Sequence, residues 1–584
     1  MKDQPVAQVK NLRVEFRSRM GVTTAVEDLS FEVAAGETLC IVGESGSGKS
    51  VSALSLMRLV EFGGGDIAGG QIVVDDVEVE AASDSTIRRL RGNKIAMIFQ
   101  EPMTALNPVF TIERQLTEGL RLHRSMTRTQ ARAEAVRLLQ EVRVPEPERR
   151  LRQFPHELSG GMRQRVVIAM ALACEPRLLI ADEPTTALDV TTQAEILALI
   201  DRLKRDNGTA VVFITHDMAV VAQMADRVVV MQGGRKVEEG AVEDIFANPK
   251  ETYTKSLLDA VLRLGAMRGQ TLPDRVGEPL LKVTGLTTRY PVKSGLLRRV
   301  TAQVHAVEDV SFTIHPGETL ALVGESGCGK STVGRSVLRL EDPLRGHVEM
   351  GGQDVLSLAG EPLRQTRRAM QMIFQDPFSS LDPRMKVAAQ LTEPMKNFDI
   401  GDPEKRVQIA TGLMDRVHLP RAYLDRYPHQ LSGGQRQRVA IARALALQPQ
   451  LIVADEALSA LDVSVQARVL DLMEELQRDL QLAFLFISHD MAVVERISHR
   501  VAVMYLGRIV EIGPREAVFE RPRHAYTRAL LSAIPVPDPA QRRKTLPEFK
   551  PIPSPLHPVG HEPGPSQYEE VAPGHHVLIS QSGY

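Results

Sequence analysis

Cysteine is scarce in this sequence. The 584 residues include only three, Cys40, Cys174 and Cys328, and these are scattered without the close spacing of metal ligands. Such scarcity favours a reducing compartment and argues against a zinc or iron–sulfur site. Cys328 lies in a glycine-rich segment, where we interpret it as a tolerated small residue and not as a nucleophile.

Long apolar runs and an excess of one charge are also missing. No stretch reaches the roughly 18 to 20 consecutive apolar residues that a membrane-spanning helix needs. The first residues, MKDQPVAQVK, have no apolar core, so we expect no secretory signal. With 71 Lys plus Arg against 73 Asp plus Glu, no global field exists that would attract nucleic acid or anionic lipid. A role at a membrane would therefore depend on other subunits.

The chain is long enough for several domains, and an internal repeat divides it. A length of 584 residues predicts two to four domains. Polar and aromatic residues recur in one order at offsets of 273 to 281 residues, which indicates two halves of one design. The predicted limits are 1–262 for the first domain with its C-terminal extension, 263–279 for a linker, 280–534 for the second domain with its extension, and 535–584 for a proline-rich tail, extended or disordered.

Predicted strands and helices alternate within each half. In the first half, residues 6–42 contain short alternating runs typical of antiparallel strands, and residues 107–155 have the spacing of a helical subdomain. Apolar segments at 39–42, 178–181 and 210–215 are interpreted as buried strands, each followed by functional polar residues. This pattern predicts an α/β fold with two tandem nucleotide-binding domains, each carrying an antiparallel β subdomain and a helical subdomain.

A glycine-rich loop follows an apolar strand in each half, as GESGSGKS at 43–50 and GESGCGKS at 324–331. A strand, such a loop and a helix direct backbone N–H groups and the helix dipole at one place, where polyphosphate can bind. The lysine of each loop would reach the β- and γ-phosphates, and the final serine would hold Mg²⁺. The chain thus has two nucleotide sites or the remains of two. Their predicted residues are Gly43, Glu44, Ser45, Gly46, Ser47, Gly48, Lys49 and Ser50, and Gly324, Glu325, Ser326, Gly327, Cys328, Gly329, Lys330 and Ser331.

Polar side chains at strand ends supply the other parts that ATP hydrolysis needs, namely a metal, a positioned water and a sensor of the γ-phosphate. Asp182 and Asp455 would hold Mg²⁺ through water, and the next residues, Glu183 and Glu456, are predicted to polarise the attacking water. One such set alone could be structural, but its repetition in the same order favours catalysis. The remaining candidates are Gln100 and Gln375 for the metal and its water, and His216 and His489 for the γ-phosphate.

A short LSGG segment opens a helix in each half, at 158–161 and 431–434. A serine and two glycines at a helix start can bind an anion, yet each half already has its own phosphate loop. We therefore expect each LSGG to close on the nucleotide of the other half, in a head-to-tail pseudo-dimer within one chain. The predicted contacts are Ser159, Gly160 and Gly161, and Ser432, Gly433, Gly434 and Gln435, the last of which is replaced by Met162 in the first half.

Together these motifs resemble those of the ATP-binding cassette family, and the resemblance covers the chain up to about residue 534. Besides the loops and LSGG, the segments that carry it are LLIADEP, LIVADEA, ITHD and ISHD. The segments FQEPMTALNP, FQDPFSSLDP, FANPKETYT and FERPRHAYT are similar to those of importer ATPases of the oligopeptide and dipeptide group. Repair ATPases of the family carry zinc cysteines, which are missing here. Translation factors would show a long charged linker, so they are the weaker alternative.

The resemblance implies ATP and Mg²⁺ as cofactors and adenine stacking on Phe16 and Tyr290, although both could instead be core residues of edge strands. It implies two membrane permease subunits that contact the region after each predicted glutamine, an extracytoplasmic solute-binding protein, and no nucleic acid partner. The expected location is the cytoplasmic face of a bacterial inner membrane. The expected substrate is glutathione or short peptides, with nickel or opines as alternatives. Relatives often end in a cysteine cluster, which this tail lacks.

Overall fold

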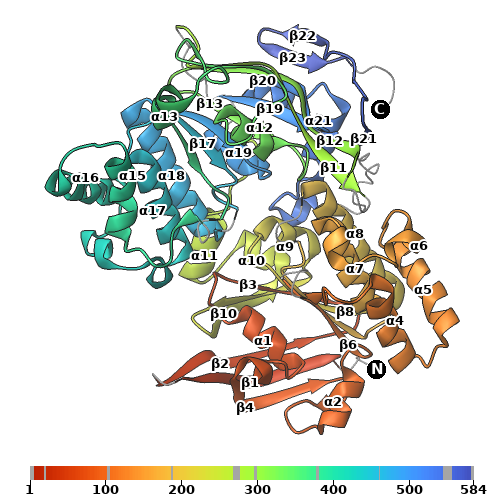
Figure 1. Cartoon of the computed structure of the whole chain (residues 1–584). Helices are drawn as coiled ribbons and strands as arrows, with labels where there is room; N and C mark the ends of the chain where they lie inside the picture. The colour runs from red at the N-terminus through yellow and green to blue at the C-terminus, as the bar shows by residue number, and fades with distance from the viewer. Residues whose placement is uncertain are drawn as a thin grey trace. The chain divides into compact units, whose positions relative to one another are not determined.

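The structure is a computed structural model that describes residues 5–18, 21–100, 105–185, 189–266, 277–294, 299–376, 380–459, 461–542 and 555–579. The chain divides into two compact units, each with its own sheets and hydrophobic core (Figure 1). The first unit comprises Met1–Leu188, Thr192–Val261 and Pro535–Glu548. The second comprises Asp189–Thr191, Leu262–Ile534 and Phe549–Tyr584.

A six-stranded sheet, in the order β10-β9-β3-β8-β7-β6, forms the centre of the first unit. Only the β9 and β10 pair is antiparallel among these described strands. Every residue of β3, β6, β7 and β8 is buried, as expected of parallel strands that are covered on both faces. The strands are β3 (Thr38–Val42), β6 (Ile95–Ile98), β7 (Leu178–Asp182), β8 (Ala210–Ile214), β9 (Arg227–Gln232) and β10 (Arg235–Ala241).

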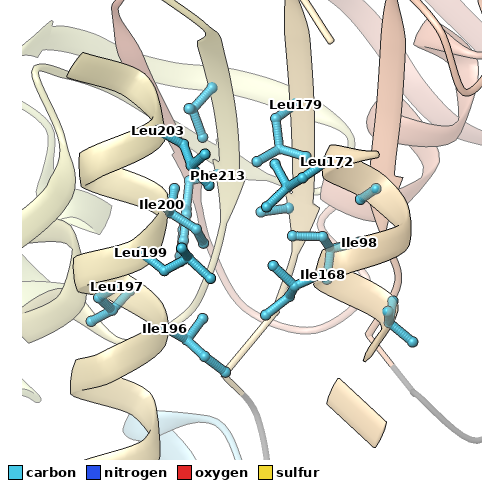
Figure 2. Close-up of a cluster of buried hydrophobic side chains, with 14 of the residues drawn as sticks. Ile98, Ile168, Leu172, Leu179, Ile196, Leu197, Leu199, Ile200, Leu203 and Phe213 are labelled. Carbon is cyan, nitrogen blue, oxygen red and sulfur yellow. The ribbon is translucent and has the colours of Figure 1, made fainter. Parts of the chain in front are cut away.

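Helices cover this sheet on both sides. Successive strand residues point to opposite faces, and every residue of the central strands β3 and β8 is buried, so both faces must be covered. On one face, α7 (Gly160–Leu172) and α8 (Val190–Asn207) pack on β7 and β8, and Figure 2 shows their side chains facing Leu179 and Phe213. On the other face, Ala53 and Leu56 of α1 (Lys49–Leu56) join a second cluster. Each large apolar side chain buried in this way contributes about 1.5–3 kcal/mol, so the strand ends that follow are held rigidly.

An antiparallel sheet and a helical subdomain complete the first unit, as predicted from the sequence. The sheet order is β2-β1-β4-β5, from β1 (Ala7–Ser18), β2 (Gly21–Val33), β4 (Gly65–Val74) and β5 (Val77–Glu78). The helical subdomain contains α4 (Ile112–His123), α5 (Arg128–Glu141), α6 (Pro147–Arg150) and η2 (Pro155–Glu157). The other helices are η1 (Val60–Gly63), α2 (Asp84–Leu90), α9 (Met218–Met224), α10 (Val242–Ala247) and α11 (Thr252–Asp259).

The second unit repeats this plan and adds strands at two edges. Its central sheet is ordered β16-β17-β18-β13-β19-β20-β23-β22, and its other sheet β15-β14-β11-β12-β21. The predicted α/β fold is therefore confirmed in both halves. The strands that repeat the first unit are β11 (Leu281–Ser294), β12 (Arg299–Ile314), β13 (Thr319–Val323), β14 (Arg345–Met350), β15 (Gln353–Asp354), β16 (Met370–Ile373), β17 (Leu451–Asp455), β18 (Ala483–Ile487), β19 (Arg500–Tyr505) and β20 (Arg508–Pro514).

Helices of the second unit follow the same order as those of the first. They are α12 (Lys330–Val337), α13 (Gly360–Ala369), α15 (Val387–Asn397), α16 (Pro403–Arg416), η3 (Arg421–Asp425), η4 (Pro428–Gln430), α17 (Gly433–Leu445), α18 (Val463–Leu480), α19 (Met491–Ile497), α20 (Arg515–Glu520) and α21 (Ala525–Ala533). No helix in the described ranges is both long enough and apolar enough to cross a membrane.

Of the two alternatives predicted for the tail, residues 555–579 have the extended backbone and are ordered as strands. This segment forms β21 (Leu556–Pro558), β22 (Tyr568–Ala572) and β23 (His575–Leu578). β21 pairs with β12, β23 pairs with β20, and β22 pairs with β23. Proline excludes a strand from the centre of a sheet but not from an edge, where its missing N–H is not needed. Earlier in the tail, η5 (Pro539–Gln541) belongs to the first unit, where the Arg542 guanidinium donates to the backbone oxygen of Ala225 at 3.0 Å.

Candidate functional site

Each glycine-rich loop connects a central buried strand to a helix, as the sequence predicts. In the first unit the loop runs from the end of β3 to α1, with Gly48 as N-cap at φ 97°. A side chain on Gly43 (φ 150°) would clash with the backbone oxygen of Met231, and one on Gly48 with that of Ala25. Only glycine tolerates both the positive φ and the close backbone approach, so the sequence forces this loop shape.

The loop of the second unit has the same geometry between β13 and α12. Gly324 has φ 149° against the backbone oxygen of Met504, and the N-cap Gly329 has φ 106° against that of Ala306. Cys328 is buried, and burial raises the pKa of its thiol. The thiol is therefore protonated at neutral pH, which agrees with the interpretation that it is not a nucleophile.

The lysine of each loop bonds to the beginning of its own loop. Lys49 Nζ donates to the carbonyl oxygens of Gly43 at 2.7 Å and Glu44 at 2.9 Å. Lys330 Nζ donates to those of Gly324 and Glu325, both at 2.8 Å. Both lysine side chains are buried, so these bonds hold each ammonium group inside the curve of its loop, where phosphate oxygens can bind.

A serine and an aspartate meet at the helix end of each loop. Ser50 Oγ donates to Asp182 Oδ1 at 3.1 Å, and Ser331 Oγ donates to Asp455 Oδ1 at 2.7 Å. Burial raises the pKa of Asp182 to about 6, despite the opposing hydrogen bond from Ser50, and burial likewise raises the pKa of Asp455. The serine hydroxyl and the aspartate carboxylate are hard oxygen donors, which are the ligands that Mg²⁺ prefers. A bound Mg²⁺ would also favour the ionised form of the buried carboxylate.

The structure brings three more predicted residues together in each unit. The two oxygens of Glu183 have different partners: Gln100 Nε2 donates to Oε2 at 2.8 Å, and His216 Nδ1 lies 3.0 Å from Oε1. Glu183 follows the end of β7 with φ 44°, an uncommon conformation for a residue with a side chain. Strained backbone of this kind is characteristic of functional positions.

The corresponding residues of the second unit repeat the arrangement. Gln375 Nε2 donates to Glu456 Oε2 at 2.7 Å, His489 Nδ1 lies 3.4 Å from Glu456 Oε1, and Glu456 has φ 45°. Burial opposes the charged forms of both Glu456 and His489. Their hydrogen bond and the attraction between their charges together outweigh burial, so the pKa of Glu456 is lowered and the pKa of His489 is raised. The carboxylate is thus ionised at neutral pH, as a general base requires.

The LSGG segments begin α7 and α17, as predicted. Ser159 Oγ caps α7 by accepting from Met162 N at 3.3 Å, and Ser432 Oγ caps α17 by accepting from Gln435 N at 3.4 Å. In the second unit, Gln435 Oε1 also accepts from Ser432 N at 3.0 Å, which completes a capping box. Met162 has no oxygen with which to do the same. The replacement noted in the sequence therefore removes one cap bond in the first unit.

Phe16 and Tyr290 lie on β1 and β11 and are only partly buried. Phe16 packs against the core of the first unit, and its ring would be close to a side chain placed on Gly65. Adenine stacking and an edge-strand core role both remain compatible with these positions.

Residues that the sequence reasoning did not assign also contact the site. Gln164 of α7 is buried, and its Nε2 donates to the backbone oxygen of Pro184, next to Glu183, at 2.6 Å. Tyr253 and Tyr526 contact the two glycine-rich loops through their hydroxyl groups. The two tyrosines recur 273 residues apart, and this repetition is the signal in the sequence that could have identified them. Their partners in the loops precede them by about 200 residues, so the sequence alone does not indicate the contact.

Comparisons with known proteins agree with this geometry. The family model described as "ABC transporter" matches residues 26–186 and 307–459, and the model "Oligopeptide/dipeptide transporter, C-terminal region" matches 237–284 and 510–559. The chain is 53% identical to a protein named "Glutathione import ATP-binding protein GsiA" from Pectobacterium atrosepticum, over 98% of this chain and 97% of the relative.

Proteins of the same name from Salmonella typhimurium and Escherichia coli O157:H7 are 52% and 51% identical, over 98% and 99% of this chain and 96% and 97% of the relatives. A solved dimeric ATP-binding cassette in a post-hydrolysis state with ADP and Pi is 29% identical, with a TM-score of 0.37, over 40% of this chain and 98% of that one. On the two matches to the family model and the relatives that span 98% of its length, the chain belongs to the ABC transporter family and carries two of its ATP-hydrolysing cassettes.

Proposed function

We propose that this chain is the ATP-hydrolysing subunit of an importer for glutathione or short peptides. The observation that carries the proposal is the likeness, over 98% of the chain, to proteins named for glutathione import. The match of both C-terminal extensions to the oligopeptide/dipeptide transporter region supports the same class of substrate. The two cassettes would be residues 1–262 and 280–534.

Within each cassette we assign the residues of the paired sites the following roles. The glycine-rich loop and its lysine bind the β- and γ-phosphates. Mg²⁺, when bound, neutralises the charge that develops on the phosphates. The residues that would hold it are Ser50, Gln100 and Asp182, and Ser331, Gln375 and Asp455.

Glu183 and Glu456 are proposed as general bases. Each carboxylate is fixed between a glutamine amide and a histidine ring, so the lone pair that accepts a proton from water is directed by the protein. The histidines, His216 and His489, would keep that carboxylate in place and extend a ring N–H to the γ-phosphate.

We further propose that the two cassettes act as a pseudo-dimer, in which each LSGG helix start meets the nucleotide held by the other cassette. The exposed helix starts at Ser159 and Ser432 support this, because several N–H groups there lack partners within the helix and can bind phosphate. Binding of two ATP molecules would draw the cassettes together, and hydrolysis would release them.

The proposed partners are two membrane permease subunits and, through them, an extracytoplasmic solute-binding protein. The chain would lie on the cytoplasmic face of a bacterial membrane. Part of the predicted permease contact, just after Gln100 and Gln375, falls at 101–104 and 377–379, outside the described residues.

Uptake measurements test the proposal. Cells that lack this chain are complemented with the wild type or with the inactive double variant Glu183→Gln and Glu456→Gln, and uptake of labelled glutathione and labelled dipeptides is compared. We expect only the wild type to restore uptake of at least one of the two solutes. If neither solute depends on the chain while its ATPase activity is intact, the proposed substrate class is wrong.

A further inference from the structure

Both C-terminal extensions place a tyrosine hydroxyl on a phosphate loop. Tyr253, in α11, accepts a hydrogen bond from the backbone N–H of Glu44 at 3.1 Å. Tyr526, in α21, accepts one from the backbone N–H of Glu325, also at 3.1 Å. The same bond occurs in both units although their sequences differ, so it belongs to the architecture that the two units share and not to one loop.

The tyrosine and the loop lysine hold opposite ends of one peptide group. In the first unit, Tyr253 binds the N–H of the Gly43–Glu44 peptide, and Lys49 Nζ binds its carbonyl oxygen at 2.7 Å. In the second unit, Tyr526 and Lys330 hold the corresponding peptide in the same way. The orientation of this peptide therefore fixes where the lysine lies, and the tyrosine hydroxyl helps to fix that orientation.

A carboxylate anchors each extension to the central sheet, half-buried in the first unit and fully buried in the second. Glu238, on β10, accepts from the backbone N–H groups of Lys250 at 2.8 Å and Glu251 at 3.2 Å, just before α11 begins. In the second unit, Glu511 of β20 accepts from Arg523 N at 2.8 Å and His524 N at 2.9 Å. These charge-assisted bonds set the start of the helix, and the tyrosine is in its first turn.

The second anchor is more deeply buried than the first. Glu511 is fully buried and also lies 2.8 Å from Nε2 of His575, which the C-terminal strand β23 contributes. Tyr526 is buried and packs against the ring of Tyr505, with centroids 4.3 Å apart, whereas Tyr253 is only partly buried. Water can more readily replace the hydroxyl of Tyr253 than that of Tyr526.

We propose that Tyr253 and Tyr526 are positioning residues for ATP binding, through which the C-terminal extensions hold the phosphate loops ready for nucleotide. The inference rests on the proposed phosphate-binding role of the loops. Without the hydroxyl, the N–H of Glu44 or Glu325 loses this hydrogen bond, and the loop can leave the competent conformation. The apparent affinity for ATP is then the intrinsic affinity multiplied by the fraction of loops that remain competent, so it falls as that fraction falls.

The test uses the full chain with Tyr253→Phe, Tyr526→Phe and the double variant, because phenylalanine keeps the ring and removes only the hydroxyl. Binding of a fluorescent ATP analogue and the kcat and KM of ATP hydrolysis are measured. We expect the Kd and KM for nucleotide to rise about 3- to 10-fold in the double variant, with the larger part from Tyr526→Phe. At saturating ATP, kcat should change less than about twofold, because bound phosphates restore the loop.

Tyr568→Phe is the matched control. It removes a hydroxyl that donates to the backbone oxygen of Ile509 at 2.8 Å, in the same unit but in the C-terminal hairpin. This control should keep the wild-type Kd and KM. Nucleotide affinity unchanged in the double variant, or lowered equally in the control, would overturn the inference. A separate variant, Lys49→Ala with Lys330→Ala, tests the loops themselves: wild-type affinity there would refute the proposed phosphate site, and the tyrosine inference with it.

Discussion

Replacement of both candidate bases, Glu183→Gln and Glu456→Gln, should nearly abolish ATP hydrolysis and leave ATP binding intact. Glutamine matches the shape of glutamate but cannot accept the proton from water. Loss of a well-placed general base reduces the rate by about 10² to 10⁴, equivalent to about 3 to 5 kcal/mol in the activation barrier.

The structural cost of the same substitution is much smaller. Each glutamate uses one oxygen for a glutamine amide and the other for a histidine ring. Glutamine offers one oxygen and one amide nitrogen, so it can keep the bond from Gln100 or Gln375 and must change the one to the histidine. A single hydrogen bond contributes about 0.5–1.5 kcal/mol to stability, which is well below the catalytic effect. The variant should therefore remain folded.

The assay combines phosphate release at saturating ATP with equilibrium binding of a fluorescent nucleotide. Thermal melting of each variant confirms that the fold is retained. We expect turnover in the double variant to fall at least about 100-fold while the Kd for ATP changes less than about threefold. Retention of more than about a tenth of the wild-type turnover would refute the role of these carboxylates as bases.

Three further predictions follow from the same geometry. Gly43→Ala and Gly324→Ala place a methyl group against the carbonyl oxygens of Met231 and Met504, so nucleotide binding should be lost. The control is Gly36→Ala, whose Cβ meets nothing within 4 Å; it should cost only about 1 kcal/mol in stability and retain nucleotide binding. Asp182→Asn with Asp455→Asn should raise the Mg²⁺ concentration that gives half-maximal hydrolysis at least about tenfold; an unchanged Mg²⁺ titration would contradict the metal assignment. Because folding lowers the pKa of Glu456 from 4.5 and raises that of His489 from 6.5, the stability from this pair is fully present between pH 4.5 and 6.5, and it is lost as the pH falls through the folded pKa of Glu456 or rises through that of His489. The stability difference between wild type and His489→Ala, measured by denaturant titration across pH, should peak in that window, and a flat difference would contradict it.

The sequence predicts the conformation of the glycine-rich loops and the placement of the residues at strand ends, because local rules determine both. A glycine with positive φ after a buried strand, such as Gly43, leaves few alternative conformations, and Asp182 and Glu183 must appear at the carboxyl edge of a parallel sheet. The repeat then doubles the signal for each residue. The meeting of Gln100, Glu183 and His216 follows from the strand order, which the alternation of strands and helices indicates.

The rest depends on partners that are far apart in the chain. The tail looks extended from its prolines, and nothing local reveals that β21 and β23 find edges on β12 and β20. The bond between Tyr253 and Glu44 joins residues 209 positions apart, so no local pattern predicts it. The sequence shows that Met162 replaces the glutamine of the second half. Only the structure shows that this replacement removes a capping bond at the start of α7.

The most direct test of the account is whether each cassette completes the nucleotide site of the other. Cysteines are introduced at Ser432 and at Ser45 in a chain whose three buried native cysteines are replaced, and disulfide formation is measured with and without ATP in the Glu183→Gln and Glu456→Gln background. A pair at Ser159 and Ser45, both in the first cassette, is the control. The account predicts ATP-dependent crosslinking of Ser432 with Ser45 and none in the control; crosslinking only in the control pair, or in neither pair with ATP bound, would contradict it.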